Sequence, residues 1–186
     1  GIFEHFQQIT ESVSIPIMIQ DAPLSGVHLS LDLLVKMARE LQGIRYFKIE
    51  MPGTADKLRN LIAEGGNSIE GPFDGEESIT LMADLDAGAK GTMPSAMIPD
   101  LIKPVVELHL GGSREQAAEH YAKILPLINY ENRQCGLRAT KALMLEGGVI
   151  TSGTVRHPLP PLSPESRKGL LELARAQAPV ALHWGK

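Results

Sequence analysis

Short apolar runs alternate along the chain with longer segments in which apolar residues recur every three or four positions. Ile17-Met18-Ile19 and residues 44–50 are compact apolar runs, typical of buried parallel strands. Residues 2–13 and 31–41 instead space their apolar side chains along one face of a helix, and Ser30 is placed to cap the second of these helices. The first part of the chain therefore predicts an α/β fold.

The strand–helix unit recurs as far as residue 112. A weak strand candidate at residues 68–71 and another candidate at residues 89–93 precede helices that we expect at about 79–86 and 99–110. Because only a few residues connect each strand to the next helix, the strands are expected to run parallel. The pattern predicts four parallel strands with helices between them.

The last third of the chain has a different character. Residues 113–129, 136–146 and 164–177 predict three helices with no strand between them, and residues 151–163 form a proline-rich connector. We expect residues 113–186 to be a helical extension of the same domain as residues 1–112.

Four strand–helix units are half of a (β/α)8 TIM barrel, and an open four-stranded sheet is the competing interpretation. The notable polar residues follow strands, which favours the barrel, because barrel enzymes build active sites at the carboxyl ends of their strands. A half barrel leaves two unpaired strand edges. Since Gly1 is not an initiator methionine, we also expect the sequence to begin partway through a longer protein.

Composition narrows the range of functions. The 186 residues are 43% hydrophobic and 22% charged with a net charge of −4, so neither a nucleic acid nor a membrane surface is indicated as a partner. No apolar run reaches the ~20 residues that span a bilayer. Cys135 is the single cysteine and is interpreted as a structural thiol. The six histidines lack metal-ligand spacing and the glycine pairs lack a phosphate-loop pattern, so no metal or nucleotide is predicted.

Lys48 stands inside an apolar strand, between Phe47 and Ile49. A lysine is rarely buried unless it is paired or reactive. A Schiff-base lysine attacks a carbonyl in its neutral form, and an apolar setting disfavours the charged form. Glu50 shares the strand face of Lys48, at a Cα separation of roughly 6.5–7 Å. We predict that this pair is catalytic, and a plain Lys–Glu ion pair is the alternative.

Further polar residues follow the other predicted strands. Gln20 and Asp21 follow the first strand, Glu77 lies in the loop after the third, and Ser95 follows the fourth. Each is a candidate to hydrogen-bond a polyhydroxy acid, although each also suits a turn, a helix cap or a helix N-terminus. Glu76 competes with its neighbour Glu77 for the position that faces the cavity.

A series of motifs runs through nearly the whole chain. They are Ile17-Met18-Ile19-Gln20-Asp21-Ala22-Pro23, Lys48, Phe73-Asp74-Gly75-Glu76-Glu77, Ala87-Gly88-Ala89-Lys90-Gly91 with Ser95, and Arg156-His157-Pro158-Leu159 with Pro161-Leu162. In this order they resemble the C-terminal part of the dihydrodipicolinate synthase / N-acetylneuraminate lyase family. The resemblance implies that the chain holds strands five to eight of a TIM barrel, with Lys48 on the sixth strand, and a C-terminal three-helix extension.

One departure from the family pattern indicates a branch. Gln20 stands where the family usually has its fifth-strand tyrosine, and with Lys48-Ile49-Glu50 it resembles the L-2-keto-3-deoxyarabonate dehydratase branch. The resemblance implies that Lys48 forms a Schiff base with the C2 ketone and that Glu50 removes a C3 proton and assists loss of the C4 hydroxyl. The product is then 2-oxoglutarate semialdehyde. The expected substrate-binding residues are Gln20, Glu77, Ser95 and Asp21.

The same resemblance implies a cytoplasmic homotetramer that needs no cofactor and binds a small keto acid, with no nucleic acid or membrane partner. A class I aldolase or dehydratase for another 2-keto acid is the first alternative. A non-catalytic barrel paralogue is the second.

Overall fold

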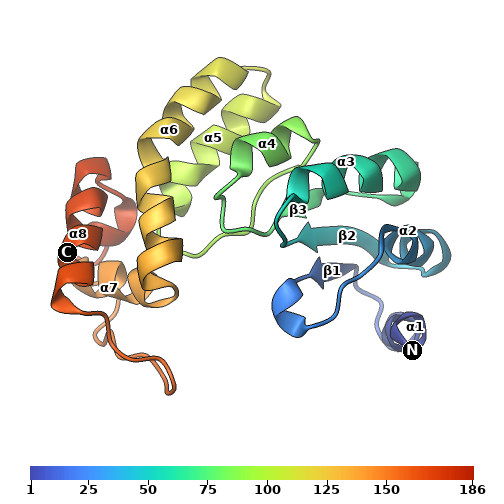
Figure 1. Ribbon diagram of the computed structural model, residues 1–186, viewed down its shortest axis with the longest axis horizontal. Helices are drawn as coiled ribbons and strands as arrows, with labels where there is room; N and C mark the ends of the chain where they lie inside the picture. The colour runs from blue at the N-terminus through green and yellow to red at the C-terminus, as the bar shows by residue number, and fades with distance from the viewer. The chain divides into compact units, whose positions relative to one another are not determined.

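The computed structural model describes residues 1–186, except for the side chain of Pro23. The chain forms two compact units, residues 1–93 and residues 94–186 (Figure 1). The predicted division into a half barrel (residues 1–112) and a helical extension (residues 113–186) refers to a whole barrel. It stays a prediction.

The first unit contains a three-stranded parallel sheet. Strands β1 (Ile17–Asp21), β2 (Ile44–Ile49) and β3 (Pro72–Asp74) pair in that order. The helices are α1 (Ile2–Ser12), α2 (Leu31–Glu40), α3 (Thr54–Gly65) and α4 (Leu81–Asp86), with 3₁₀ turns at Pro23–Ser25 and Gly66–Ser68. A helix follows each strand, so the predicted alternation of strands and helices is confirmed in this unit.

The helix after β1 begins at its predicted cap. The Ser30 side chain accepts a hydrogen bond from the backbone N–H of Leu33 at 3.3 Å, which satisfies one of the free amides of the first turn of α2. The apolar face of α2 is buried through Leu34, Val35 and Met37. The helical spacing of apolar residues therefore predicts this element correctly.

Strand β2 is the centre of the sheet. Phe47 and Ile49 are fully buried on one of its faces, and the strand packs against α2 and α3. Each such side chain contributes about 1.5–3 kcal/mol through burial. Tyr46 and Lys48 point to the other face and are half-buried. The sequence predicts cover on both faces, whereas the structure buries one face fully and the other in part.

The third strand lies further along the chain than predicted. Residues 68–71 are not a strand, because Gly71 adopts φ +46° and Glu70 turns its carboxylate toward Arg45 and the Tyr46 hydroxyl. The strand begins instead at Pro72, where the missing proline N–H removes no bond from the middle of a ladder. The weak candidate was therefore wrong in position.

The predicted fourth strand, residues 89–93, forms only a β-bridge between Asp74 and Thr92. The segment does run beside β3, since the N–H of Asp74 donates to Gly91 O and the N–H of Met93 donates to Asp74 O. Gly91 has no side chain and Met93 is 41% exposed, so little burial is available to extend the pairing. The prediction of a full strand was wrong.

The second unit is helical. It contains α5 (Pro99–Leu110), α6 (Arg114–Tyr130), α7 (Arg138–Glu146) and α8 (Pro164–Gln177), with a π-helical turn at Glu131–Cys135 and a 3₁₀ turn at Val180–Leu182. The four helices expected after residue 98 are confirmed. Cys135 is buried, and burial raises the pKa of its thiol, which disfavours the reactive thiolate.

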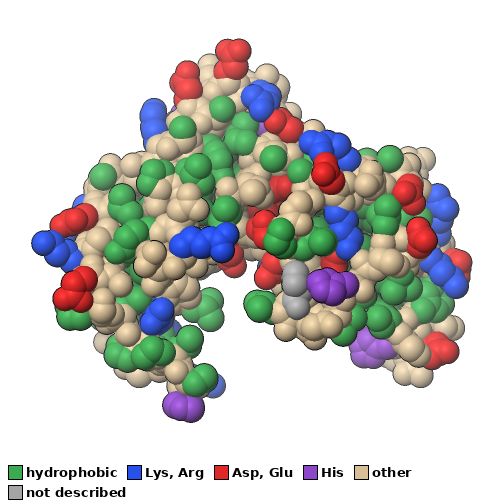
Figure 2. Space-filling view, viewed as in Figure 1, with side chains coloured by type: hydrophobic (Ala, Val, Ile, Leu, Met, Phe, Trp, Pro, Cys, Tyr) green, Lys and Arg blue, Asp and Glu red, His purple; other side chains and the backbone are tan. Residues whose placement is uncertain are grey.

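Acidic and basic side chains are interspersed on the face seen in Figure 2. Among the described helices, none is both long and apolar enough to cross a membrane. The described side chains also include no group of three His, Cys, Asp or Glu residues placed to hold a metal ion.

Asp84 in α4 is a fully buried carboxyl group that the sequence pattern does not single out. Its Oδ2 accepts a hydrogen bond from Thr80 Oγ1 at 2.6 Å, and within the described part of the chain Oδ1 has no hydrogen-bond partner. Burial raises the pKa of Asp84 to about 6. The Thr80 bond opposes this rise, the charges of Asp74 and Glu76 add to it, and that of Arg59 opposes it.

We expect Asp84 to make folding less favourable as the pH rises. The folded state keeps the Asp84 proton up to about pH 6, whereas the unfolded chain releases it near pH 3.9. The contribution of Asp84 to the free energy of unfolding is therefore complete below pH 4 and is lost as the pH rises from about 4 to 6. The loss is roughly 2–3 kcal/mol. Urea denaturation between pH 4 and 7.5 should show that Asp84→Asn lacks this part of the pH dependence.

The matched control for this measurement is Asp86→Asn, which removes an exposed carboxyl group from the same helix. A difference between wild type and Asp84→Asn that stays constant from pH 4 to 7.5 contradicts the prediction.

Candidate active site

The strand register brings Gln20, Lys48 and Phe73 side by side. Gln20 of β1 lies opposite Lys48 of β2, which lies opposite Phe73 of β3. Residues in register on neighbouring strands project from the same face of a sheet. The three side chains therefore meet on one face near the carboxyl ends of the strands, where α/β proteins bind their ligands.

Lys48, Glu50 and Gln20 form one cluster of polar contacts. Lys48 Nζ lies 3.4 Å from Glu50 Oε2, and Gln20 Nε2 donates a hydrogen bond to the same oxygen at 2.5 Å. The Lys48 side chain is 16% exposed and that of Glu50 is 25% exposed. The ion pair that the sequence left as an alternative is present. The same arrangement places a carboxylate where it can take a proton from a group bound at Lys48.

Backbone pairing continues beyond the last residue of β2 and holds Glu50 in place. The N–H of Glu50 donates to Asp21 O at 2.9 Å, and the N–H of Gly75 donates to Ile49 O at 2.8 Å. The peptide between Ile49 and Glu50 is therefore held from both neighbouring strands. This leaves Glu50 little freedom to move away from Lys48.

Gly75 is a site residue that sequence reasoning missed. A Cβ atom on Gly75 would lie 2.9 Å from Glu50 Cβ, 2.9 Å from Ile49 O and 3.0 Å from Lys48 Cε. Only glycine lets the loop after β3 approach the Lys48 and Glu50 side chains this closely. The signal that could have found it is a glycine directly after a buried strand.

Glu76 and Glu77 follow Gly75 in the loop that leads toward α4. Both side chains are half-buried. Glu77 has φ +54° and Ser78 has φ +67°, values that residues with a side chain rarely adopt. The structure thus places both acids in a strained loop that begins against Lys48, and the preference for Glu77 over Glu76 stays a prediction.

Asp21 is not brought into this cluster. Strand alternation turns its side chain away from the face of Gln20, and its carboxylate pairs with Lys57 Nζ of α3 at 2.5 Å. Lys57 also donates to Leu29 O at 2.6 Å, and the N–H of Leu29 donates to Asp21 Oδ1 at 3.4 Å. Asp21 therefore ties the loop after β1 to α3, and sequence reasoning missed its partner Lys57.

Ser95 belongs to the second unit. Its hydroxyl group donates a hydrogen bond to Glu131 Oε1 at 2.5 Å and accepts one from the N–H of Met97 at 3.3 Å. Glu131 is buried and also accepts a hydrogen bond from Thr140 Oγ1 at 3.4 Å. The predicted role of Ser95 in substrate binding stays a prediction.

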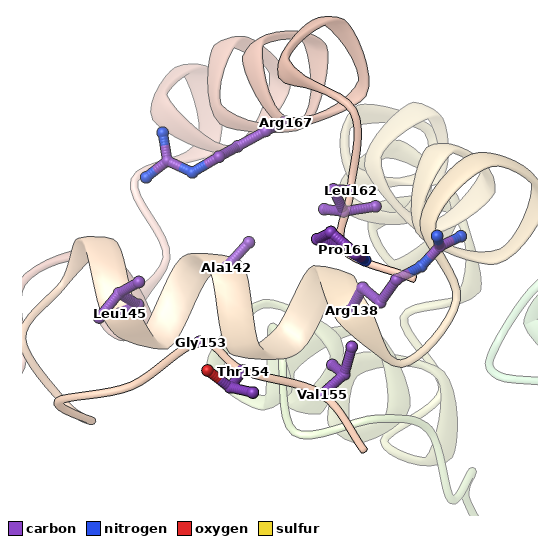
Figure 3. Close-up of a pocket in the computed structure, with 9 residues that line it drawn as sticks. All are labelled: Arg138, Ala142, Leu145, Gly153, Thr154, Val155, Pro161, Leu162 and Arg167. Atoms are coloured by element: carbon purple, nitrogen blue, oxygen red, sulfur yellow. The ribbon is translucent and has the colours of Figure 1, made fainter. Parts of the chain in front are cut away.

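A cavity of about 310 Å³ lies in the second unit, between α7, the connector and α8 (Figure 3). Two arginines, Arg138 and Arg167, are among its lining residues, and both are engaged with neighbours. Arg138 donates to the backbone oxygens of Cys135 and Pro160, and Arg167 donates to Glu146. Of the residues described, those that line this cavity include none of the predicted site residues, so the candidate site remains the Lys48 cluster.

Comparison with known sequences adds an independent finding. The sequence profile of the Dihydrodipicolinate synthetase family matches residues 1–177. The chain is 52% identical over 183 residues to an L-2-keto-3-deoxyarabonate dehydratase from Azospirillum brasilense, covering 98% of this chain and 59% of that protein. It is 36% identical over 178 residues to 4-hydroxy-tetrahydrodipicolinate synthase 1 from Halalkalibacterium halodurans, covering 94% and 58%.

Comparison with solved structures agrees with the sequence matches. A crystal structure of dihydrodipicolinate synthase from Aquifex aeolicus superposes with a TM-score of 0.87 at 26% identity, covering 96% of this chain and 60% of that one. A second, from Rhodopseudomonas palustris, has a TM-score of 0.83 at 26% identity, covering 94% and 60%. The chain spans about three-fifths of the length of the relatives that it matches.

We expect Gly75→Ala to destabilise the first unit by about 1–3 kcal/mol, because the new methyl group overpacks against Ile49 O, which cannot move without breaking the sheet. The matched control is Gly91→Ala, whose Cβ would meet Phe73 at an ordinary 3.5 Å. Urea denaturation measures both variants. Equal stability of the two variants contradicts the close approach at Gly75.

We expect Lys57→Met to cost about 3–5 kcal/mol, because it leaves the buried Asp21 carboxylate without its cation. The control on the same helix is Arg59→Met, which breaks an exposed pair with Asp56 worth at most about 1 kcal/mol. Chemical denaturation should also show that Asp21→Asn recovers part of the stability lost in Lys57→Met. Failure of this recovery contradicts the assignment of the loss to the pair.

Proposed function

The chain belongs to the dihydrodipicolinate synthetase family, an α/β TIM-barrel family, and from this premise we propose that it carries the reacting lysine of a Schiff-base dehydratase. The proposed substrate is a 2-keto-3-deoxy sugar acid, L-2-keto-3-deoxyarabonate, and the proposed product is 2-oxoglutarate semialdehyde. The observation that carries the proposal is the contact of Lys48 with Glu50, whose carboxylate is held by Gln20. The 52% identity to a dehydratase of this specificity supports the choice of substrate.

The proposal includes a place for this chain in the barrel. Strands β1, β2 and β3 and residues 89–93 correspond to strands five to eight, so that residues 1–112 are the second half of the barrel and residues 113–186 its helical extension. The parallel order of the three strands and the helices of the second unit support this assignment. The coverage of about three-fifths of the relatives' length is also consistent with it.

The reaction begins with formation of the imine. Neutral Lys48 Nζ attacks the C2 ketone of the substrate to give a carbinolamine, whose hydroxyl group takes a proton from solvent and leaves as water to give an iminium ion. The Lys48 side chain is 16% exposed and Gly75 lies against its Cε, so most of the lysine is shielded from water where the imine forms. The iminium ion withdraws electrons from C3 and acidifies its protons.

Glu50 is proposed to act next as a general base. Its Oε2 lies 3.4 Å from Lys48 Nζ, which places the carboxylate beside the carbon atoms next to the imine. It takes a C3 proton, a C3–C4 double bond forms, and the C4 hydroxyl group leaves as water with a proton returned by Glu50. A proton then moves from C5 to C3, the resulting enol becomes the C5 aldehyde, and hydrolysis of the imine frees Lys48.

The remaining candidates are assigned to binding and support. Gln20 cannot transfer a proton, and its amide fixes the Glu50 carboxylate that does. Glu77 and Ser95 are proposed to hydrogen-bond the substrate hydroxyl groups. Asp21 was expected to do the same, and its pairing with Lys57 instead favours an indirect part through the loop after β1.

Assembly and location complete the proposal. A homotetramer in the cytoplasm, acting on a small keto acid without a cofactor, follows from the family resemblance. The 36% identity to a 4-hydroxy-tetrahydrodipicolinate synthase favours, as the second candidate, a class I enzyme that acts on another 2-keto acid. Gln20 in the place of the family's tyrosine argues against that second candidate.

We expect borohydride reduction of the protein in the presence of the keto acid to leave a stable mass increment on Lys48. Lys48→Ala should lose both the increment and turnover, whereas Lys90→Ala, which removes an exposed lysine, should keep both. Glu50→Gln should form the adduct but lose roughly 10²- to 10⁴-fold in turnover, because only the proton transfer is removed. Peptide mass spectrometry and a coupled semialdehyde dehydrogenase assay measure the two signals.

Each outcome of this experiment separates the candidates. An adduct on Lys48 without semialdehyde favours the second candidate, and the absence of any adduct favours a non-catalytic barrel protein. Full turnover by Glu50→Gln would contradict the role of Glu50 as general base.

A further inference from the structure

Asp74 is a fully buried carboxylate at the end of β3, and its oxygen atoms collect three hydrogen bonds. Oδ1 accepts from the N–H of Glu76 at 2.7 Å, and Oδ2 accepts from the N–H of Ser78 at 3.1 Å and from Thr92 Oγ1 at 2.7 Å. Hydrogen bonds to an ionised carboxylate are among the strongest in proteins. Asp74 therefore binds the amides of Glu76 and Ser78, the residues on either side of Glu77.

The loop that Asp74 holds is strained. Glu77 at φ +54° and Ser78 at φ +67° are consecutive residues with side chains in the left-handed region, where a Cβ atom makes the backbone unfavourable. Such a conformation persists only where the surroundings impose it. The amides of Glu76 and Ser78 converge on one carboxylate, which supplies that constraint.

Burial and the neighbouring donors act on the pKa of Asp74 in opposite directions, and the net effect is a rise. Burial raises its pKa, and the hydrogen bonds from Thr92, Glu76 and Ser78 together with the positive charge of Lys48 act against that rise. Lys48 lies in register with Phe73, the residue that precedes Asp74 on β3. Loop and lysine are also joined through Gly75, which lies against Lys48 Cε.

We propose that Asp74 is a positioning residue that holds the loop Gly75–Ser78 in its left-handed conformation and thereby presents Glu77 to the substrate bound at Lys48. The inference rests on the proposed function, since it concerns the second carboxylate of the same reaction. Asp74 itself does not touch the substrate. It acts by determining where Glu77 lies relative to the imine.

The first test separates positioning from general damage. In Asp74→Asn the amide keeps the size of the side chain but replaces one acceptor oxygen by a donor, so at least one of the three donors loses its partner. We expect kcat to fall roughly 10- to 100-fold, as for a misplaced catalytic group. The yield of the borohydride adduct on Lys48 should stay within about twofold, because imine formation does not use Glu77. Equal losses of adduct and turnover would overturn the proposal.

The second test asks whether Asp74 acts through Glu77. When Glu77→Gln has already removed the carboxylate, adding Asp74→Asn should lower kcat by less than about twofold. Independent effects that multiply in the double variant would overturn the proposal.

A milder pair of variants keeps the test decisive if Asp74→Asn fails to fold. Thr92→Val removes the hydroxyl group that bonds both Asp74 and Ser78 and keeps the shape of the side chain, whereas Thr92→Ser keeps the hydroxyl group. We expect a loss of kcat at constant adduct yield in Thr92→Val, with recovery in Thr92→Ser. The same loss in both variants would contradict the proposal.

Hydrogen exchange distinguishes failure of this inference from failure of the proposed function. The amides of Glu76 and Ser78 should exchange faster in Asp74→Asn than in wild type, whether or not the enzyme forms a Schiff base. Faster exchange with no adduct in wild type would reject the proposed function and, with it, the role of Glu77. Unchanged exchange together with a normal adduct would reject the positioning role of Asp74 alone.

Discussion

The hydrogen bonds that extend parallel pairing beyond β2 are the constraint on which the rest of the site depends. Glu50 N–H reaches back to β1 at Asp21 O, and Gly75 N–H reaches Ile49 O from the end of β3. The central strand is thereby held from both sides at the point where Lys48 and Glu50 lie. Because the backbone of Ile49 and Glu50 is fixed in this way, Gln20 bonds Glu50 and Gly75 lies against Lys48.

Strand alternation gives neighbouring residues different tasks at this edge of the sheet. Gln20 and Phe73 lie in register with Lys48, whereas the next residues, Asp21 and Asp74, turn to the other face and are buried. Each of these two carboxylates is compensated, Asp21 by the ammonium group of Lys57 and Asp74 by hydrogen-bond donors. Each ties down the loop that follows its strand, so two acids that do not face the lysine shape the surroundings of the site.

Local patterns predicted the elements whose stability is local or strongly periodic. The capped, amphipathic α2 and the helices of the second unit lie close to their expected positions, and Lys48 lies beside Glu50 as strand alternation predicts, in the ion pair that was the alternative to a catalytic pair. The position predicted for the third strand, residues 68–71, and the full strand predicted at residues 89–93 were wrong, and both segments contain a glycine. Gly71 takes a positive φ and Gly91 offers no side chain to bury, so pairing there depends on the neighbouring strand rather than on the residues themselves.

The amino-acid sequence by itself determined the strand–helix alternation, the lysine in the central strand and the glutamate on its face, because periodicity and apolar context act within a few residues. Only the tertiary structure decided that Gly75 must lack a side chain, that Asp21 faces α3, and that Asp74 holds the loop bearing Glu77. Those features arise from contacts between residues that are distant in sequence, such as Asp21 with Lys57 and Asp74 with Thr92. Their partners are selected by the packing of the sheet and not by any spacing along the chain.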